Sequence, residues 1–161
     1  MKTVAEFPPC VLPDPSAVQG RTTSAYPAQF QLEPGTRIKR ALGNALGLTN
    51  FGVNLTTLQP GGMSAHRHWH ETQDEFIYVL DGELTLVTDE GETRLSPGMA
   101  AGFKAKVPNG HQLINKSDRP ATYLEVGDRL PNDAGHYPDL DLHVHEEDGK
   151  WVYTNKAGVR Y

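Results

Sequence analysis

The chain is short of cysteine and has no long hydrophobic run. Cys10 is the single cysteine among 161 residues, so the monomer can form neither a disulfide nor a thiolate metal site. No run of about 18 apolar residues is present, and the first residues lack the apolar segment of an export signal. These absences predict a cytoplasmic protein that does not span a membrane. Its length suits a single domain with its own hydrophobic core.

An excess of basic residues is also missing. The chain has 15 lysines and arginines against 20 acidic residues, for a formal net charge of −5, and the two signs are interspersed. This balance argues against nucleic acid as a partner, as does the lack of a helix-turn-helix pattern in the first fifty residues. Arg37, Lys39 and Arg40 form the one basic cluster. The favoured interpretation is a solvated loop or strand edge, and the alternative is a pocket for a phosphate or carboxylate.

No strong helical periodicity is present, and turn residues are frequent. Sixteen glycines and twelve prolines divide the chain into short segments that are β-branched or alternate in polarity, which predicts an all-β sandwich or barrel. We expect strands near residues 26–32, 37–42, 51–59, 64–70, 75–80, 83–88, 91–95, 99–104, 111–115, 121–127 and 150–154.

The distribution of prolines and of periodic segments along the chain predicts three regions. Residues 1–25 carry four prolines and no periodicity, and we expect an N-terminal arm that lies across the domain or across a neighbouring subunit. Residues 26–128 form the predicted β-barrel. Residues 129–161 form a C-terminal extension packed on the barrel, with a long ordered loop that ends in the strand at 150–154.

Histidines at alternate positions indicate a metal site. His66, His68 and His70 project to one face of an extended segment, and Glu75 can turn back toward the same space from the next strand. His111, in a turn that leads into a later strand, is the natural fourth ligand. Buried imidazoles and carboxylates are costly unless something binds or pairs them, and three histidines with one glutamate suit a divalent cation with open positions.

The segment that holds these residues resembles the first motif of the cupin superfamily. That motif is Gly, five residues, His-x-His, three or four residues, Glu, six residues, Gly, and it is met at Gly62, His68, His70, Glu75 and Gly82. Counting from the flanking residues selects His68 and His70 as ligands. His66 is then a candidate catalytic acid or base, with a hydrogen-bonded structural histidine at the barrel rim as the alternative.

The second cupin motif is also recognisable. It is matched by Gly102, Pro108, Gly110, His111 and Asn115, except that His111 follows Gly110 directly, so that the loop is two residues shorter. The resemblance covers most of the chain. The chain is also similar to a group of bacterial single-domain cupins whose members are sometimes labelled as sugar-phosphate isomerases. It implies a double-stranded β-helix, a jelly-roll barrel, with His68, His70, Glu75 and His111 as metal ligands.

Some further side chains are candidates for the pocket or the surface. Lys104 and Asn115 are candidate substrate-binding residues by strand parity, and a surface lysine and a turn-bonding asparagine are the alternatives. The apolar residues on either side of Glu125 are expected on the inner face, which turns Glu125 and Tyr123 outward. His143-x-His145, in a charged context, is expected on the surface or at a lid edge.

The metal motif defines the chemistry only coarsely. We expect one divalent transition metal per chain, and the residues do not choose among Zn, Fe, Ni, Mn and Cu. The first hypothesis is an isomerase or lyase acting on a small polar molecule, either sugar-like or a hydroxy acid. The alternatives are an iron- or copper-dependent dioxygenase and a non-catalytic small-ligand-binding or sensor protein.

The expected oligomer is a homodimer. Phe76, Tyr78 and Leu80 alternate along one strand on the face opposite the ligands, and together with the arm they would leave a monomer with an exposed apolar face.

Overall fold

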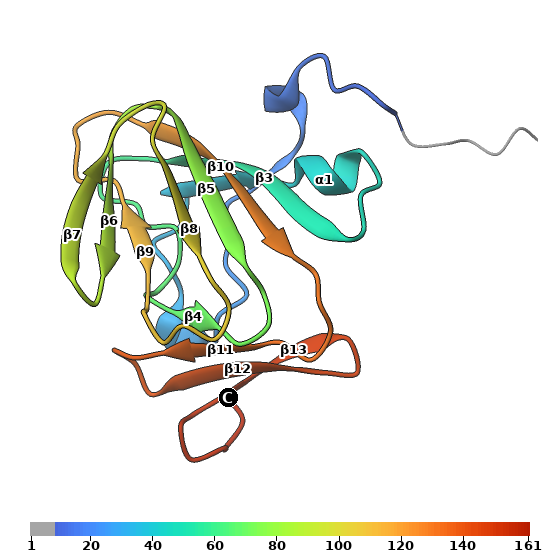
Figure 1. The fold of residues 1–161 in the computed structure, drawn as a ribbon, viewed down its shortest axis with the longest axis vertical. Coiled ribbons are helices and arrows are strands. Elements are labelled where there is room, and N and C mark those ends of the chain that lie inside the picture. The colour runs from blue at the N-terminus through green and yellow to red at the C-terminus, as the bar shows by residue number, and fades with distance from the viewer. Residues whose placement is uncertain (1–8) are drawn as a thin grey trace, which may run out of the picture.

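The computed structural model describes residues 9–161 and contains three antiparallel sheets within that range (Figure 1). The largest has the strand order β1 (Gly20–Arg21), β2 (Arg37–Arg40), β3 (Phe51–Leu58), β10 (Ala121–Asp128), β5 (Glu75–Asp81) and β8 (Ala100–Phe103). A smaller sheet has the order β7 (Gly91–Leu95), β6 (Leu84–Thr88) and β9 (Gln112–Ile114). These two sheets form the barrel, and the predicted all-β jelly roll is confirmed.

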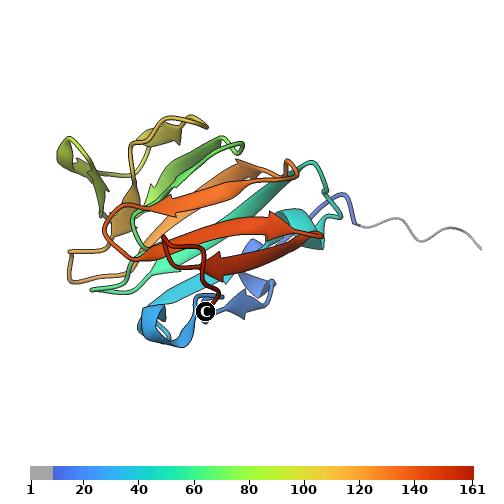
Figure 2. The same cartoon turned by 90° about the horizontal axis from the view of Figure 1, so that it is seen from below.

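The third sheet closes one end of the barrel. Its order is β13 (Lys150–Thr154), β12 (Leu142–Glu147), β11 (Ala134–Tyr137) and β4 (Trp69–His70), so a strand from the middle of the chain joins three strands from its C-terminal part. It lies along the bottom of the view in Figure 1, and Figure 2 shows its red strands in front of the barrel. This sheet brings the C-terminal residues to the histidine segment.

Helical structure is limited to short turns. The described residues include two 3₁₀ turns, η1 (Pro15–Ala17) and η2 (Ala28–Phe30), and a single α-helical turn, α1 (Leu42–Ala45). Within residues 9–161, no helix has the length and apolar character that a membrane span requires.

The hairpin between β5 and β6 shows how the sequence specifies the barrel. Gly82 has a φ of +75°, in the left-handed region. A Cβ atom at Gly82 would lie 2.6 Å from the carbonyl oxygen of Pro120 and 2.6 Å from the Cα of Ala121. Only glycine satisfies both the backbone conformation and the close approach to the start of β10. The glycine that ends the first motif is therefore required by packing.

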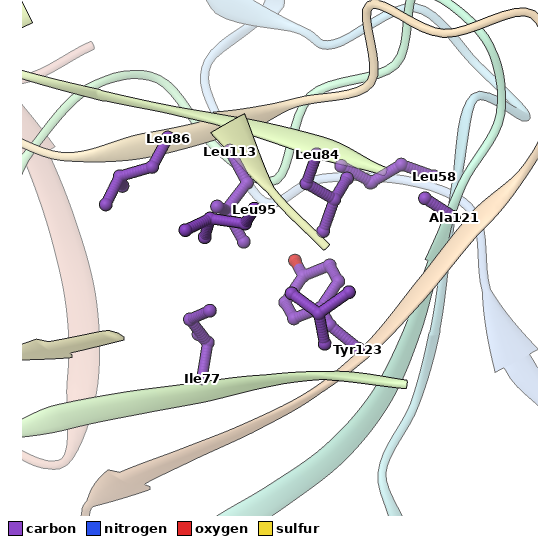
Figure 3. Close-up of a cluster of buried hydrophobic side chains, with 9 residues drawn as sticks. Leu58, Ile77, Leu84, Leu86, Leu95, Leu113, Ala121 and Tyr123 are labelled. Atoms are coloured by element: carbon purple, nitrogen blue, oxygen red, sulfur yellow. The ribbon is translucent and has the colours of Figure 1, made fainter. Parts of the chain in front are cut away.

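The hydrophobic core lies between the two barrel sheets (Figure 3). Leucines of the smaller sheet point toward side chains of β5 and β10, and the cluster comprises Leu58, Ile77, Val79, Leu84, Leu86, Leu95, Leu113, Ala121 and Tyr123. Each large apolar side chain buried in this way contributes roughly 1.5–3 kcal/mol. The part of the barrel next to the histidines is lined by both polar and apolar side chains, and the core residues Ile77 and Leu113 are among them.

The predicted facing of β10 is wrong. Tyr123 is fully buried in the core, and Glu125 lies on the same face, whereas Leu124 pairs across the sheet with Leu55 on the outer face. The prediction placed the more apolar alternate residues inside. It failed because the inner face of this barrel becomes polar where β10 passes the site.

Most strand positions are confirmed, with four corrections. The segment expected as a strand at 26–32 contains the 3₁₀ turn η2, and the strand expected at 37–42 ends at Arg40, before α1. Within 64–70 only Trp69–His70 is a strand. The long loop expected after residue 129 contains the strands β11 and β12 instead.

The N-terminal arm is partly described. Gly20 and Arg21 pair with Arg40 and Lys39 of β2, so this part of the arm adds a strand to the large sheet of the same chain. Residues 1–8 of the predicted arm lie outside the described residues. The division into arm, barrel and extension stays a prediction.

Candidate metal centre

Side chains from three sheets converge at one end of the barrel. His70 ends β4 of the third sheet, Glu75 begins β5 of the large sheet, and His111 directly precedes β9 of the small sheet. His68 is held opposite His111 by a pair of backbone hydrogen bonds, in which His111 N–H donates to the His68 carbonyl at 2.9 Å and the reverse bond measures 3.2 Å.

Glu75 Oε2 is the atom on which the three imidazoles converge. His111 Nε2 donates a hydrogen bond to it at 2.9 Å, and the Nε2 atoms of His70 and His68 lie 3.8 Å and 4.0 Å away. His68, His70 and Glu75 have ligand atoms within 4.8 Å of one another, the spacing of donors that can share one ion. His111 contacts this group through its hydrogen bond to Glu75.

The outer nitrogens of two histidines are fixed by acceptors. His70 Nδ1–H donates to Asp133 Oδ2 at 2.5 Å, and His68 Nδ1–H donates to the carbonyl of His66 at 2.7 Å. Both bonds leave the Nε2 lone pair directed toward Glu75. Such outer contacts are typical of metal-binding histidines, because they set the tautomer and the ring orientation.

Asp133 is a residue of the site that the sequence analysis missed. It is buried, and it also accepts hydrogen bonds from the Thr72 N–H at 2.8 Å and from the Thr72 hydroxyl at 3.0 Å. It lies in a loop before β11, sixty-three residues after His70, with no periodicity around it. No local signal in the sequence could have connected it with the histidines.

His111 is positioned by stacking. Its ring lies 3.6 Å from that of Phe103, centroid to centroid, at an interplanar angle of 3°. Its Nδ1 is buried and has no hydrogen-bond partner among residues 9–161. A buried imidazole nitrogen without a partner is costly, and it is the other nitrogen, Nε2, that faces Glu75 and the site.

The protonation states of the site suit metal binding. Burial lowers the pKa of His68 to about 4, so that this imidazole is neutral near pH 7. Burial opposes the ionisation of Glu75, but the hydrogen bond from His111 and the neighbouring histidines outweigh it and lower the pKa of Glu75. The neutral imidazole of His68 beside the ionised carboxylate of Glu75 is the ligating form of each group.

The donor set therefore fits a divalent transition metal. Imidazole and carboxylate ligands bind zinc, iron, nickel, manganese and copper, and the ligand types alone do not separate these ions. His68, His70 and Glu75 would hold the ion, with His111 as the adjacent candidate. Within residues 9–161 this is the one group of metal-binding side chains with suitable spacing.

A cavity of about 360 Å³ adjoins the four converging side chains. Four tyrosines contribute to its lining: Tyr26, Tyr123, Tyr137 and Tyr153. Burial raises the pKa of Tyr153 to about 12 and that of Tyr123 well above its usual value. These phenols are therefore neutral near pH 7, and Tyr153 can donate a hydrogen bond to a hydroxyl, carbonyl or anionic oxygen of a ligand, whereas the Tyr123 hydroxyl donates to Glu125 at 3.3 Å.

Two members of the basic cluster line the same cavity. The side chain of Arg37 is buried, with the residue 6% exposed, and Lys39 forms an ion pair with Glu125. The prediction of a solvated cluster is wrong for both residues, because alternate positions of β2 face the barrel interior. Arg40, on the other face, donates a hydrogen bond to the carbonyl of Ser16 at 3.0 Å.

His66 lies next to the ligands in sequence but points elsewhere. Its Nε2–H donates to the carbonyl of Phe30 at 2.8 Å, and its ring packs 4.9 Å from that of Tyr26. The chain from Ser64 to Arg67 is irregular, so strict alternation does not carry His66 to the face of His68.

The two predicted substrate-binding residues occupy different environments. Lys104 is exposed and borders a second cavity of about 200 Å³ that also reaches His70, Glu75 and His111. Asn115 is fully buried, and its Nδ2 donates to the carbonyls of Leu58 at 2.9 Å and Arg119 at 2.7 Å.

His143 and His145 belong to β12, on the outer side of the third sheet. Both are partly buried, and His145 Nε2–H donates to Glu147 at 2.9 Å. His136 of β11 lies beside His143, with ring centroids 4.7 Å apart, and stacks on Trp69. The prediction placed His143 and His145 on the surface or at a lid edge. The structure places them, partly buried, in a strand.

Comparison with known proteins agrees with this arrangement. A family model described as a cupin domain matches residues 54–127. Among curated proteins, no sequence matches this chain. The solved structure of a sugar phosphate isomerase from a cupin superfamily, from Silicibacter pomeroyi, has 42% sequence identity and a TM-score of 0.88, with 92% of this chain and 94% of that chain covered.

A second solved structure is also similar. It is a protein from Acidithiobacillus ferrooxidans, provisionally named as a sugar phosphate isomerase, with 30% identity and a TM-score of 0.72 over 80% of this chain and 83% of that chain. The fold and the converging histidines define a β-barrel with a candidate metal site. The chain belongs to the cupin superfamily.

Proposed function

We propose that the protein is a metal-dependent enzyme of the isomerase or lyase type that acts on a small, polar, sugar-like or hydroxy-acid molecule. One divalent transition metal per chain is held by His68, His70, Glu75 and His111. The observation that carries the proposal is the cavity beside these side chains, to which four tyrosines and the charged residues Arg37, Lys39 and Glu125 contribute. The similarity to a protein named as a sugar phosphate isomerase supports the same reaction class.

A metal held by His68, His70, Glu75 and His111 would serve as a Lewis acid toward a carbonyl or hydroxyl oxygen of the substrate. The chain supplies the other requirements of proton transfer. Glu125 lines the cavity and is not among the proposed ligands, so its carboxylate is our candidate acceptor for a substrate proton. Asn54 Nδ2 donates to Glu125 Oε1 at 3.0 Å and the Tyr123 hydroxyl donates to Oε2 at 3.3 Å, which fixes the orientation of this carboxylate.

The metal content of the purified protein tests the first half of the proposal. We expect a transition metal in the wild-type protein by elemental analysis, and loss of most of it in His68→Ala and Glu75→Ala. His143→Ala is the matched control, because it removes a histidine outside the site and should keep the metal. Wild-type protein that binds no transition metal after incubation with each of the five ions would refute the metal site.

Proton exchange tests the second half. Sugars, sugar phosphates and 2-hydroxy acids are incubated with the metal-loaded protein in D₂O and followed by NMR. Isomerisation or elimination with deuterium incorporation supports the proposal, and Glu125→Gln should lose the incorporation while keeping the metal. Bound iron or copper with substrate-dependent oxygen uptake would identify a dioxygenase instead. Saturable binding without turnover or exchange would identify a binding or sensor protein.

The roles of His66, Lys104 and Asn115 and the cellular location are also proposals. The hydrogen bond from His66 to the Phe30 carbonyl favours a structural histidine over a catalytic acid or base, and Lys104 would act at the second cavity. Asn115 has its amide hydrogens bonded to main-chain carbonyls, which favours a role in the turn that follows. A cytoplasmic location stays a prediction that rests on the cysteine content.

A further inference from the structure

Strand β2 places two cations on the wall of the cavity that adjoins the candidate metal centre. Arg37 and Lys39 are two positions apart, so both face the barrel interior, opposite Leu58 and Thr56 of β3. Arg21, which pairs with Lys39 across β1 and β2, also borders the cavity. The basic residues thus belong to the wall of the proposed active site.

Arg37 is a buried charge without a counter-ion. Its Nη1 donates to the carbonyl of Ser64, and its Nη2 donates to the carbonyl of Thr23 at 3.2 Å. Its Nε is buried without a hydrogen-bond partner, and the guanidinium forms no ion pair with any of residues 9–161. A buried guanidinium that contacts only neutral carbonyls is costly, and an anion beside it would lower that cost.

Lys39 is neutralised within the wall and leaves the charge of Arg37 uncompensated. Its Nζ pairs with Glu125, and Asn54 and Tyr123 also donate to that carboxylate. The ammonium has three donors, so one remains engaged with Glu125 while others can reach a ligand. Arginine and lysine cations outnumber the carboxylates that line the cavity, three to two, before the charge of any metal is added.

We propose that Arg37 and Lys39 form a subsite for a small oxyanion, a carboxylate or a phosphate group of the substrate. This inference rests on the proposed function and narrows its substrate class to anionic molecules. The anionic group lies against β2, and the reacting carbonyl or hydroxyl lies toward the histidines. Arg37 is held by the carbonyls of Thr23 and Ser64, so its guanidinium is oriented before the anion arrives.

Anion binding to the metal-free protein tests the subsite directly. Inorganic phosphate and acetate are titrated separately into chelator-treated protein at low ionic strength and followed by calorimetry. We expect saturable binding of at least one anion, weakened at least about tenfold in Lys39→Gln and Arg37→Gln. Tighter binding of phosphate would assign a phosphorylated substrate, and tighter binding of acetate a carboxylate.

Arg40→Gln is the matched control. It removes the same charge from the same strand, but Arg40 lies on the other face and should change the affinity by less than about twofold. Lys39→Gln keeps the test decisive where Arg37→Gln disturbs the fold, because Lys39 is only partly buried. The absence of saturable binding by both anions, or equal effects of Lys39→Gln and Arg40→Gln, would overturn the proposal.

The two proposals fail in different ways. The anion titration contains no metal and no turnover, so it reports on β2 alone, whereas elemental analysis and deuterium incorporation report on the histidines and Glu125. Anion binding by a protein that never holds a metal would leave the subsite standing and remove the proposed enzyme. A metal-loaded, catalytic protein without an anion site would leave the proposed enzyme standing and remove the subsite.

Discussion

His70 is joined to Asp133 by a 2.5 Å hydrogen bond between its Nδ1 and the Asp133 carboxylate. Burial alone would lower the pKa of His70, but this bond and the carboxylate of Glu75 outweigh it and raise that pKa. Asp133 belongs to the segment that leads into β11, so a proposed metal ligand depends for its orientation on the C-terminal part of the chain.

Asp133→Asn should weaken metal binding by about 10–100-fold, because the amide no longer fixes the tautomer of His70 or increases its basicity. Competition with a chromogenic chelator measures the affinity. Asp118→Asn, at an exposed position, is the control and should leave the affinity unchanged. Equal affinities of Asp133→Asn and the wild-type protein would contradict the role of this bond.

Arg67→Met should destabilise the protein by roughly 1–3 kcal/mol, because Arg67 links two separate segments through charged hydrogen bonds. Its Nε donates to Asp139 at 2.7 Å and its Nη2 at 2.6 Å, and Nη1 pairs with Asp89. Methionine keeps part of the apolar stem that packs beside Gly110. Urea denaturation gives the free energy of unfolding.

Arg94→Met is the comparison for that variant. Arg94 pairs with Glu83, but its side chain is 74% exposed, so its removal should have little effect on stability. Similar losses of stability in the two variants would show that the link made by Arg67 contributes no more to the free energy of unfolding than an exposed ion pair does.

The titration of His68 should make the metal-free protein less stable as the pH falls from about 6.5 to about 4. Its pKa is about 4 when folded and 6.5 in the ordinary state, so in this interval the unfolded chain binds a proton that the folded chain does not. The contribution is at most about 3 kcal/mol. His70, whose pKa is raised, acts in the opposite direction.

The contributions of His68 and His70 to the pH dependence of stability are distinguished with a variant. The free energy of unfolding is measured against pH for chelator-treated wild-type protein and for His68→Asn. The difference between the curves should rise with pH over the stated interval and be flat above it. A flat difference throughout would mean that His68 is not held neutral by burial.

Gly82→Ala should destabilise the fold more than Gly35→Ala, although both glycines have positive φ values, +75° and +79°. A Cβ at Gly35 meets no atom within 4 Å, so Gly35→Ala bears only the cost of the left-handed backbone, about 1–2 kcal/mol. At Gly82 the overlap with β10 is added. Thermal unfolding of the two variants compares them, and equal midpoints would contradict the packing argument.

The expected homodimer rests on an exposed apolar face of β5. Phe76 is 44% exposed, Tyr78 39% and Leu80 44%. Light scattering should give twice the chain mass of 17.7 kDa for the wild-type protein and a shift toward one chain mass for Leu80→Glu. Val159→Glu, at a position 63% exposed near the C-terminus, is the control. A monomeric wild-type protein at micromolar concentration would reject the dimer.

The sequence predicted those parts of the structure that depend on local spacing. The intervals around His68, His70 and Glu75 brought these residues together, because a short connection between β4 and β5 leaves the chain few ways to fold. The Asp81-Gly82 turn was predictable because its conformation requires glycine.

Features that depend on distant pairing were not predictable in this way. Tyr123 and Glu125 face inward because of the register between β10 and its neighbours, and hydrophobic alternation assigned the opposite parity. Arg37 was expected in solvent because a charged side chain on a strand is usually exposed, and only the closed barrel shows that it lines a cavity. Asp133 depends on a pairing of β4 with β11 that no local pattern signals.

The convergence of three sheets on Glu75 has a consequence for how the molecule opens. An ion bound there would act as a cross-link between β4, β5 and the start of β9, elements of separate sheets. Separating any one sheet would then require losing a ligand, so metal binding should couple their local openings into one cooperative unit. Amide hydrogen exchange in the third sheet would slow together with exchange in the barrel, even though no residue after Asp128 is a proposed ligand.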